Sequence, residues 1–312
     1  MVALSDNVRG ATFMMLAMAG FCVSDAIMKL VAEDLPLFQA IFLRGAFASV
    51  LLGLFAWREG VLTFRSTNHD RIALNIRVVG EVFGAICLLH AIINMPIVNA
   101  TAIVQVIPLA VTLSATLMFR EYVPWRSYLA IMVGFMGVLL IIRPGGDGFN
   151  IHSLWAMGTV LFFTVRDLAT RRLSPRTSSV FVAFMTSIAI TVVSGTISMT
   201  MPWQHIELAE VTLLFGAAVF IFVGYLFSVM TMRVGEIGFV APFRYSILLW
   251  ASLLGFLLFG EIPDQLTTMG SVVIVVMGIY ALSGKQRTAG QASSASEKVD
   301  PVSNRRQAGS QT

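Results

Sequence analysis

Charged residues are scarce in this chain of 312 amino acids: they make up 12% of it, whereas hydrophobic residues make up 57% and the mean hydropathy is +0.82. This balance excludes an ordinary soluble domain, in which about a quarter of the residues are charged. The apolar residues fall in runs of about 20, the length that an α-helix needs to cross the hydrocarbon core of a bilayer. Short blocks of alternating polarity, typical of outer-membrane barrels, are absent. The composition therefore predicts an all-α integral membrane protein.

Cysteine and histidine are also rare, with two and four copies in the chain. Both cysteines, Cys22 and Cys87, lie inside apolar runs and provide neither a disulfide framework nor a metal-ligand spacing. The motifs G-x-S-x-G, H-E-x-x-H and the nucleotide-binding P-loop are absent as well. An intramembrane enzyme, a metal centre and an ATP-driven pump within this chain therefore lack support, and we expect no cofactor. A membrane scaffold is a weaker alternative, because the loops are too short for a docking domain.

The apolar runs predict ten membrane helices. We expect them over residues 11–31, 36–57, 72–93, 98–119, 124–142, 152–172, 177–200, 209–232, 237–259 and 263–283. The first run is followed at once by Pro36 and a second apolar run, which predicts a retained helix rather than a cleaved signal peptide. Residues 285–312 are rich in Ser, Ala, Gln and Gly, a composition typical of a disordered tail.

Lysine and arginine are distributed unevenly over the predicted loops. With ten helices both termini share one side of the membrane. That side holds Arg9, Arg58, Arg65, Arg71, Arg120, Arg126, Arg171, Arg172, Arg176, Arg233, Lys285, Arg287, Lys298, Arg305 and Arg306. The other side holds only Lys29 and Arg143. By the positive-inside rule this difference places residues 1–10 and the C-terminal tail on the cytoplasmic side of the membrane. The formal charge of +4 then reflects orientation in the lipid bilayer, and we expect no nucleic-acid partner.

The second half of the chain repeats the first. Residues 20–30, GFCVSDAIMKL, align with residues 162–172, FFTVRDLATRR, at a shift of 142 positions. Residues 116–124, TLMFREYVP, match residues 256–263, FLLFGEIP, at a shift of 140. Because each half holds five helices, an odd number, the second half must enter the membrane from the opposite side. Inverted repeats of this kind are typical of secondary transporters, whose solute site lies near the midplane between the repeats.

Two stretches resemble the EamA repeats of the drug/metabolite transporter superfamily. The first is HAIINMPIVNATAIVQVIPLAVTLSATLMFRE with a following helix that ends GVLLIIRPG, and the second is MRVGEIGFVAPFRYSILLWASLLGFLLFGEIPD with GSVVIVVMGIYALSG. The resemblance implies a ten-helix carrier of two inverted repeats, over residues 11–143 and 152–283, that works by alternating access.

The solute is less well defined by these resemblances. The opening run NVRGATFMMLAMAGFCVSDAIMKL resembles the bacterial riboflavin-uptake branch, and APFRYSILLW is shared with relatives suggested to carry S-adenosylmethionine or amino acids. The resemblance therefore implies a small-molecule solute, riboflavin first and the others as alternatives. Import or export, proton coupling, and a monomer or a homodimer remain open.

Ionisable residues inside the predicted helices are the candidate solute contacts, because a charge at membrane depth costs about 2.5–3.5 kcal/mol on insertion scales. Arg166 is the best candidate, since Ser24 stands at its counterpart in the first repeat. Pro108 and Pro242 interrupt one helix in each half, a pattern that indicates a central binding region. The predicted cavity-lining residues are Arg44, Glu81, Gln105, Arg166, Arg244, Tyr245 and Trp250. Arginine and amide groups would donate hydrogen bonds, and the aromatic rings would stack on a flat solute.

A further set of residues either forms ion pairs or takes part in coupling. It comprises Asp25, Lys29, Arg77, His90, Asp167 and Arg171. Asp25 and Asp167 each precede a cation by four residues, the favourable spacing for a pair on one helix. Arg77 is spaced to pair with Glu81, and Arg44 either pairs with Asp25 or lines the cavity. The histidine of this set is either a packing residue or a proton relay.

Overall fold

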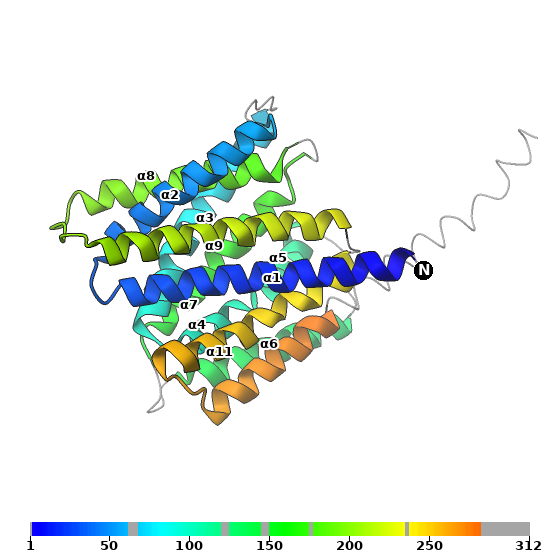
Figure 1. Cartoon of the computed structure of the whole chain (residues 1–312). Coiled ribbons are helices and arrows are strands. Elements are labelled where there is room, and N and C mark those ends of the chain that lie inside the picture. The colour runs from blue at the N-terminus through cyan, green and yellow to red at the C-terminus, as the bar shows by residue number, and fades with distance from the viewer. Residues whose placement is uncertain are drawn as a thin grey trace, which may run out of the picture.

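The structure is a computed structural model that describes residues 2–61, 68–119, 125–144, 150–174, 177–234 and 237–281, and all regular elements within these ranges are helical. In chain order they are α1 (Val2–Val31), α2 (Leu37–Arg58), α3 (Asn68–Asn94), α4 (Ile97–Val104), α5 (Ile107–Phe119), α6 (Trp125–Ile142), α7 (Ser153–Thr170), α8 (Ser179–Ser198), α9 (Leu208–Val234), α10 (Ile237–Val240), the 3-10 turn η1 (Ala241–Ser246) and α11 (Ile247–Phe259). A last helix, Gln265–Ala281, follows α11. Figure 1 shows these helices gathered into one bundle.

Helix is present in each of the ten segments for which the sequence predicts it. Among the described residues, seven helices are long and apolar enough to cross a membrane, and the count of ten crossings stays a prediction. One boundary is wrong: α1 begins at Val2 instead of residue 11. A helix can extend past its apolar run because its backbone hydrogen bonds are local. Two features predicted from the sequence lie outside the described residues: Glu121, in the repeated stretch TLMFREYVP, and the tail, residues 285–312.

Two of the predicted helices are interrupted. In the fourth, α4 ends at Val104 and α5 begins at Ile107, and in the ninth, η1 separates α10 from α11. A proline follows or lies in each interruption, Pro108 in α5 and Pro242 in η1. Because proline lacks the amide hydrogen of a regular helix and its ring crowds the preceding turn, helical hydrogen bonding is weakened at both places.

The helices pack in pairs that join the two halves of the chain (Figure 1). α1 lies against α9, α3 against α7, and α2 against α8. In the predicted repeat, α1 corresponds to α7, α2 to α8 and α3 to α9. The α1–α9 and α3–α7 contacts are therefore two copies of one contact, and α2 packs on its own counterpart. This packing is the one expected for repeats related by a pseudo-twofold axis.

Glycines allow close approach at these duplicated contacts. A Cβ atom on Gly84 of α3 would meet the ring of Phe163 of α7, and one on Gly224 of α9 would meet the ring of Phe21 of α1. Phe21 and Phe163 are 142 positions apart and Gly84 and Gly224 are 140 apart, the two shifts found in the sequence. In membrane bundles small residues at a crossing permit the backbone contact that stabilises helix association.

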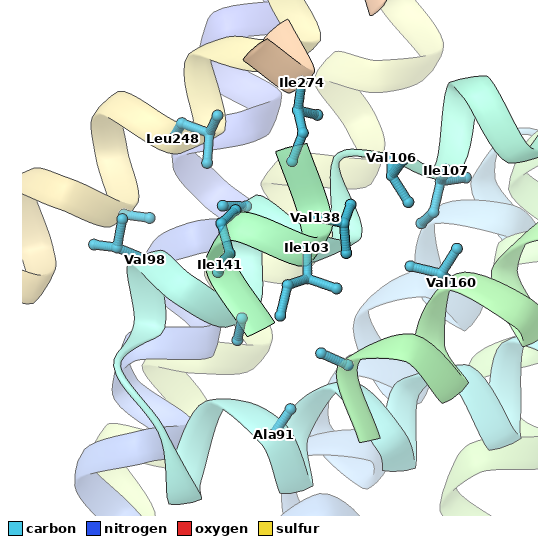
Figure 2. Close-up of a cluster of buried hydrophobic side chains, with 14 of the residues drawn as sticks. Ala91, Val98, Ile103, Val106, Ile107, Val138, Ile141, Val160, Leu248 and Ile274 are labelled. Atoms are coloured by element: carbon cyan, nitrogen blue, oxygen red, sulfur yellow. The ribbon is translucent and has the colours of Figure 1, made fainter. Parts of the chain in front are cut away.

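An extensive apolar core lies around the interrupted helices. Figure 2 shows its side chains converging from α3, α4, α5, α6, α7, α11 and the last helix. Within it α6 crosses the last helix at two glycines, because a Cβ on Gly137 would lie 2.9 Å from the carbonyl oxygen of Gly270. Small residues on both helices permit this close crossing.

Replacing Gly80 by alanine is expected to destabilise the protein by about 1–3 kcal/mol through overpacking. The new Cβ would lie 2.8 Å from the carbonyl oxygen of Phe162 and 3.1 Å from the backbone nitrogen of Arg166, so α3 and α7 would have to separate. Gly216→Ala is the matched control, since nothing lies within 4 Å of its added Cβ and alanine is the better helix former. Thermal midpoints of the purified proteins in detergent compare the two. A larger loss for Gly216→Ala would contradict the α3–α7 packing.

Candidate functional site

Six ionisable side chains lie inside the bundle and form what we call the central charge cluster. It contains three arginines and three carboxylates: Asp25 of α1, Arg44 of α2, Arg77 and Glu81 of α3, and Arg166 and Asp167 of α7. Their side chains are only 7% to 27% exposed. Ionisable groups at membrane depth are costly, and those that persist generally face a bundle interior and mark a functional site.

Arg166 links two carboxylates on different helices. One terminal nitrogen lies 3.2 Å from Oε1 and 3.3 Å from Oε2 of Glu81, and Nε donates a hydrogen bond of 2.8 Å to Oδ1 of Asp167. The guanidinium carbon also lies 4.0 Å from the centre of the Phe163 ring, a cation–π contact. The planar guanidinium makes this sharing feasible, because its donors point in several fixed directions.

Arg77 makes the second contact to Glu81. Its Nη2 lies 3.6 Å from Oε2 of that carboxylate, as the spacing on α3 predicts. Its Nη1 donates a hydrogen bond of 2.8 Å to the hydroxyl of Thr186 in α8. The Nε of Arg77 is buried and has no hydrogen-bond partner among the described residues. Glu81 thus lies between two arginines, one of which retains an unused donor.

Arg44 and Asp25 form the other part of the cluster. Nη1 of Arg44 lies 3.7 Å from Oδ1 of Asp25 and 3.5 Å from the hydroxyl of Ser24, which links α2 to α1. The sequence predicted that Arg44 either pairs with Asp25 or lines the cavity, and the structure shows the pair with Asp25. A role in solute contact stays a prediction, because an ion pair can open to a ligand.

Tyr225 of α9 lies within electrostatic range of both parts of the cluster, and it was not predicted from the sequence. The groups in range are Glu81 and the arginines of the cluster, and the Tyr225 ring packs edge to face on Phe21 at a centroid distance of 5.4 Å. The available signal was weak: Tyr225 is the only tyrosine in the apolar sequence of α9.

The ion pairs expected within α1 and α7 are replaced by other pairs. Asp25 contacts Arg44, while Lys29 pairs with Glu261 at 2.5 Å. Asp167 pairs with its neighbour Arg166. A buried carboxylate pairs with a cation that packing brings to it from an adjacent helix or a neighbouring residue, and the largely buried Lys29 is already paired with Glu261. Arg171 is exposed directly after α7.

The predicted residues of the ninth helix separate into two environments. Arg244 is partly buried and lies within electrostatic range of Asp167. Tyr245 and Trp250 instead belong to the apolar core, where the Tyr245 hydroxyl occupies the place that a Cβ on Gly278 would take. Consecutive residues of a helical turn point in different directions, so a stretch of sequence alone could not assign them to one side.

Gln105 connects the two interruptions of the helices. Its Nε2 donates a hydrogen bond of 3.4 Å to the backbone carbonyl of Arg244. The side chain is buried, and it stands in the turn between α4 and α5. The structure therefore brings the two proline-containing interruptions together, as the repeat predicts for segments near the centre.

His90 lies in an aromatic group at the end of α3. Its ring centre is 4.4 Å from that of Trp155 and 5.6 Å from that of His152. The side-chain amide of Asn94 donates to its backbone carbonyl at 2.8 Å. These contacts favour the packing interpretation of His90, and a role in proton transfer stays untested.

A small apolar pocket between α2, α8 and α9 is lined in part by Tyr225, and a larger apolar pocket lies elsewhere. The larger pocket has a volume of about 410 Å³ and is lined by apolar and aromatic side chains of α5, α6 and α7, among them Leu113, Met132, Phe135 and Met157. None of the predicted solute contacts is in its lining. The hypothesis that Arg44, Glu81, Arg166 and Arg244 share one cavity therefore stays a prediction, with electrostatic proximity as its present support.

Arg166→Met is expected to destabilise the protein by about 3–5 kcal/mol, because it leaves two buried carboxylates with one cation fewer. Combining it with Glu81→Gln should cost less than the sum of the single effects, since the second change removes one unpaired charge. Arg58→Met, at the exposed end of α2, is the control for loss of a surface arginine. The thermal midpoints of the wild-type protein, the two single variants and the double variant give the double-mutant cycle. Additive effects would show that Arg166 and Glu81 do not interact.

Comparison with known proteins identifies the family. The profile of the EamA-like transporter family matches residues 8–143 and again residues 150–284. A solved crystal structure aligns with 90% of this chain and 99% of its own, with a TM-score of 0.63 and 16% identity, which shows a shared fold.

Several curated proteins are similar over most of their length. The chain is 23% identical over 290 residues to an S-adenosylmethionine uptake transporter of Rickettsia felis, covering 91% of this chain and 96% of that protein. It is 26% identical to a pseudopaline exporter of Pseudomonas aeruginosa, with coverage of 86% and 93%. It is also 26% identical to a riboflavin transporter of Vibrio cholerae, with coverage of 86% and 91%. Because the family profile matches nearly the whole chain in two copies, this protein belongs to the EamA-like transporter family and is a multi-pass membrane transporter.

Proposed function

We propose that the protein moves a small organic solute across the bacterial inner membrane by alternating access, with riboflavin as the first candidate. The observation that carries the proposal is the central charge cluster, whose residues come from both halves of the chain. A relative movement of the halves would change the contacts between Arg166 and Glu81. A solute bound between them would thereby be coupled to the movement, as expected for inverted-repeat carriers.

The chemistry of the cluster favours a solute with several hydrogen-bond acceptors. Arg44, Arg77 and Arg166 are paired with carboxylates, whereas Arg244 has no carboxylate within 4.0 Å in the described part of the chain. Arg244 and the unused Nε of Arg77 supply donors beyond those that the protein itself satisfies. A guanidinium plane or the ring of Tyr225 can also stack on a flat ring.

Riboflavin meets these requirements, because it combines a flat three-ring system with carbonyl and ring-nitrogen acceptors. The similarity to the riboflavin transporter of Vibrio cholerae supports it. S-adenosylmethionine is the second candidate. It is a cation at its sulfonium and amino groups, which the three carboxylates of the cluster would accept, and the similarity to the transporter of Rickettsia felis supports it.

The proposal includes the orientation and organisation predicted from the sequence. The excess of cations predicted for one side, fifteen against two, supports an orientation with both termini in the cytoplasm. The first repeat would span residues 11–143 and the second residues 152–283, with ten crossings in all. A monomer and a homodimer are both compatible with this organisation.

Uptake of radiolabelled riboflavin tests the function in a bacterial strain that can neither make nor import it. We expect saturable uptake with the wild-type chain and a loss of about tenfold or more with Arg166→Ala and Arg44→Ala, because each removes donors from the central charge cluster. Arg58→Ala, at the exposed end of α2, is expected to retain uptake.

Membrane levels of every variant are measured alongside, and Arg166→Lys, which keeps the charge, covers the case in which Arg166→Ala fails to insert. An excess of unlabelled S-adenosylmethionine distinguishes the two solutes. Absence of riboflavin uptake by well-inserted wild-type protein would overturn riboflavin as the solute. Full uptake by well-inserted Arg44→Ala and Arg166→Ala would overturn the site.

A further inference from the structure

An ion pair outside the central charge cluster lies at the end of the bundle where α1 ends and α2 begins, which we call the outer end. Nζ of Lys29 lies 2.5 Å from Oε1 of Glu261 and donates a hydrogen bond of 2.9 Å to the carbonyl oxygen of Met95. It also lies 4.8 Å from the centre of the Phe259 ring. Both charged side chains are largely buried, with exposed fractions of 13% and 16%. Lys29 therefore joins α1 to the turn before α4 and to the end of α11.

Glu261 makes an additional contact with its second oxygen. Oε2 accepts a hydrogen bond of 2.8 Å from the backbone N–H of Ile97, the first residue of α4. The first amide groups of a helix lack partners within the helix, and a carboxylate there also interacts favourably with the helix dipole. One carboxylate from the second half of the chain thus holds α1 and α4 of the first half.

Other contacts at the outer end also join the two halves. Arg143, at the end of α6, pairs with Asp264, which precedes the last helix. Gln39 of α2 exchanges two hydrogen bonds with the backbone of Gln204, at 2.9 and 3.1 Å. Hydrogen bonds from Thr267 and Arg143 lower the pKa of Asp264 to about 2, so this carboxylate is ionised at physiological pH.

The distribution of these contacts matches the charge pattern of the sequence. Lys29 and Arg143 are the two cations predicted for the outer side, and each pairs with a carboxylate of the second half. Lys29 is the more buried of the two cations, since the Arg143 side chain is 26% exposed and that of its partner 49%. Exposed pairs contribute little, whereas breaking a buried pair leaves an uncompensated charge.

We infer that Lys29 and Glu261 form a latch that keeps the outer end of the bundle closed, and that solute exchange with the outside requires this pair to separate. The inference rests on the proposed function, because it assumes that the two halves part at the outer end. Such a movement separates α1 and α4 from the end of α11, so it must break the ion pair and the hydrogen bond from Ile97 to Glu261. The strength of the latch then sets the population of the outward-open state.

Thiol labelling from each side of the membrane tests the latch. Cys22→Ala and Cys87→Ala remove both native cysteines, and Ser24→Cys places a reporter at a fully buried position beside Asp25. A membrane-impermeant maleimide is applied to right-side-out and to inverted vesicles. We expect Lys29→Met to raise the rate of labelling from the side that holds the α1–α2 loop about tenfold. A tenfold change corresponds to a decrease of about 1.4 kcal/mol in the free energy by which the closed state is favoured over the open state.

Two further variants separate the ion pair from the hydrogen bond. Glu261→Gln removes the charge but keeps an oxygen that can accept from Ile97, and it should also raise labelling. Lys29→Arg keeps the charge and should label nearly as slowly as the reporter alone. Glu33→Gln, an exposed carboxylate in the α1–α2 loop, is the matched control and should have no effect.

Solute uptake by the corresponding chains that retain Ser24, in vesicles of the same kind, distinguishes failure of the latch from failure of the proposed function. Unchanged labelling in both Lys29→Met and Glu261→Gln, with normal uptake, would overturn the latch and leave the carrier proposal intact. Increased labelling of Lys29→Met and Glu261→Gln, together with no solute uptake by the wild-type chain, would support the latch and overturn the proposed solute. An equal increase in labelling with Glu33→Gln would also overturn the latch. The increase would then follow from any change of charge at the outer end, and not from loss of the Lys29–Glu261 pair.

Discussion

The cost of burying charge in a low-dielectric interior is the constraint on which the rest of this structure depends. Carboxylates such as Glu81 and Asp167 are tolerated inside an apolar bundle when a cation reaches them with good geometry. Arg166 does so for both at once, because its guanidinium offers donors in several directions. For those bonds to form, α3 and α7 must approach closely, and the glycines at positions 80 and 84 permit the approach. Pairing of the buried charges on α3 and α7 therefore requires small residues where these two helices cross.

The scaffold is symmetric, but the chemistry placed on it is not. The contacts α1–α9 and α3–α7 repeat each other, and so do the phenylalanine–glycine contacts within them. Arg166, however, stands where the first repeat has Ser24, and Arg44 of the first repeat bonds to that serine. A symmetric framework supplies two equivalent ways to pack, which suits a carrier with two opposite openings. Under the proposed function, the departures from symmetry would carry the specificity for a solute.

Two buried charge networks lie at different depths of this bundle. The central charge cluster joins α1, α2, α3 and α7 inside the bundle, while Lys29 and Glu261 join the two halves at the outer end. In a protein that alternates between two states, each pair that breaks on opening contributes to the free-energy difference between them. Under the proposed function, the central charge cluster would respond to the solute and the Lys29–Glu261 pair would control access, so the two networks together would link binding to opening.

Much of the fold followed from the sequence alone, because in lipid the backbone must satisfy its own hydrogen bonds and only helices do so within one segment. Apolar runs gave the helical segments, prolines gave the interruptions near residues 105 and 242, and the duplicated motifs gave the repeat. The acid-to-cation spacing on α3 correctly paired Arg77 with Glu81.

The partners of the remaining charges were decided only by the tertiary structure. Spacing along α1 and α7 suggested pairs with Lys29 and Arg171, but Asp25 and Asp167 contact Arg44 and Arg166 instead. Local spacing describes neighbours on the surface of one helix, whereas a buried group pairs with whatever the adjacent helix presents. The same reason separates Arg244 from Tyr245 and places Tyr225 beside the cluster. The sequence by itself determined which segments are helices and how they repeat, and the packing of those helices decided which charges meet.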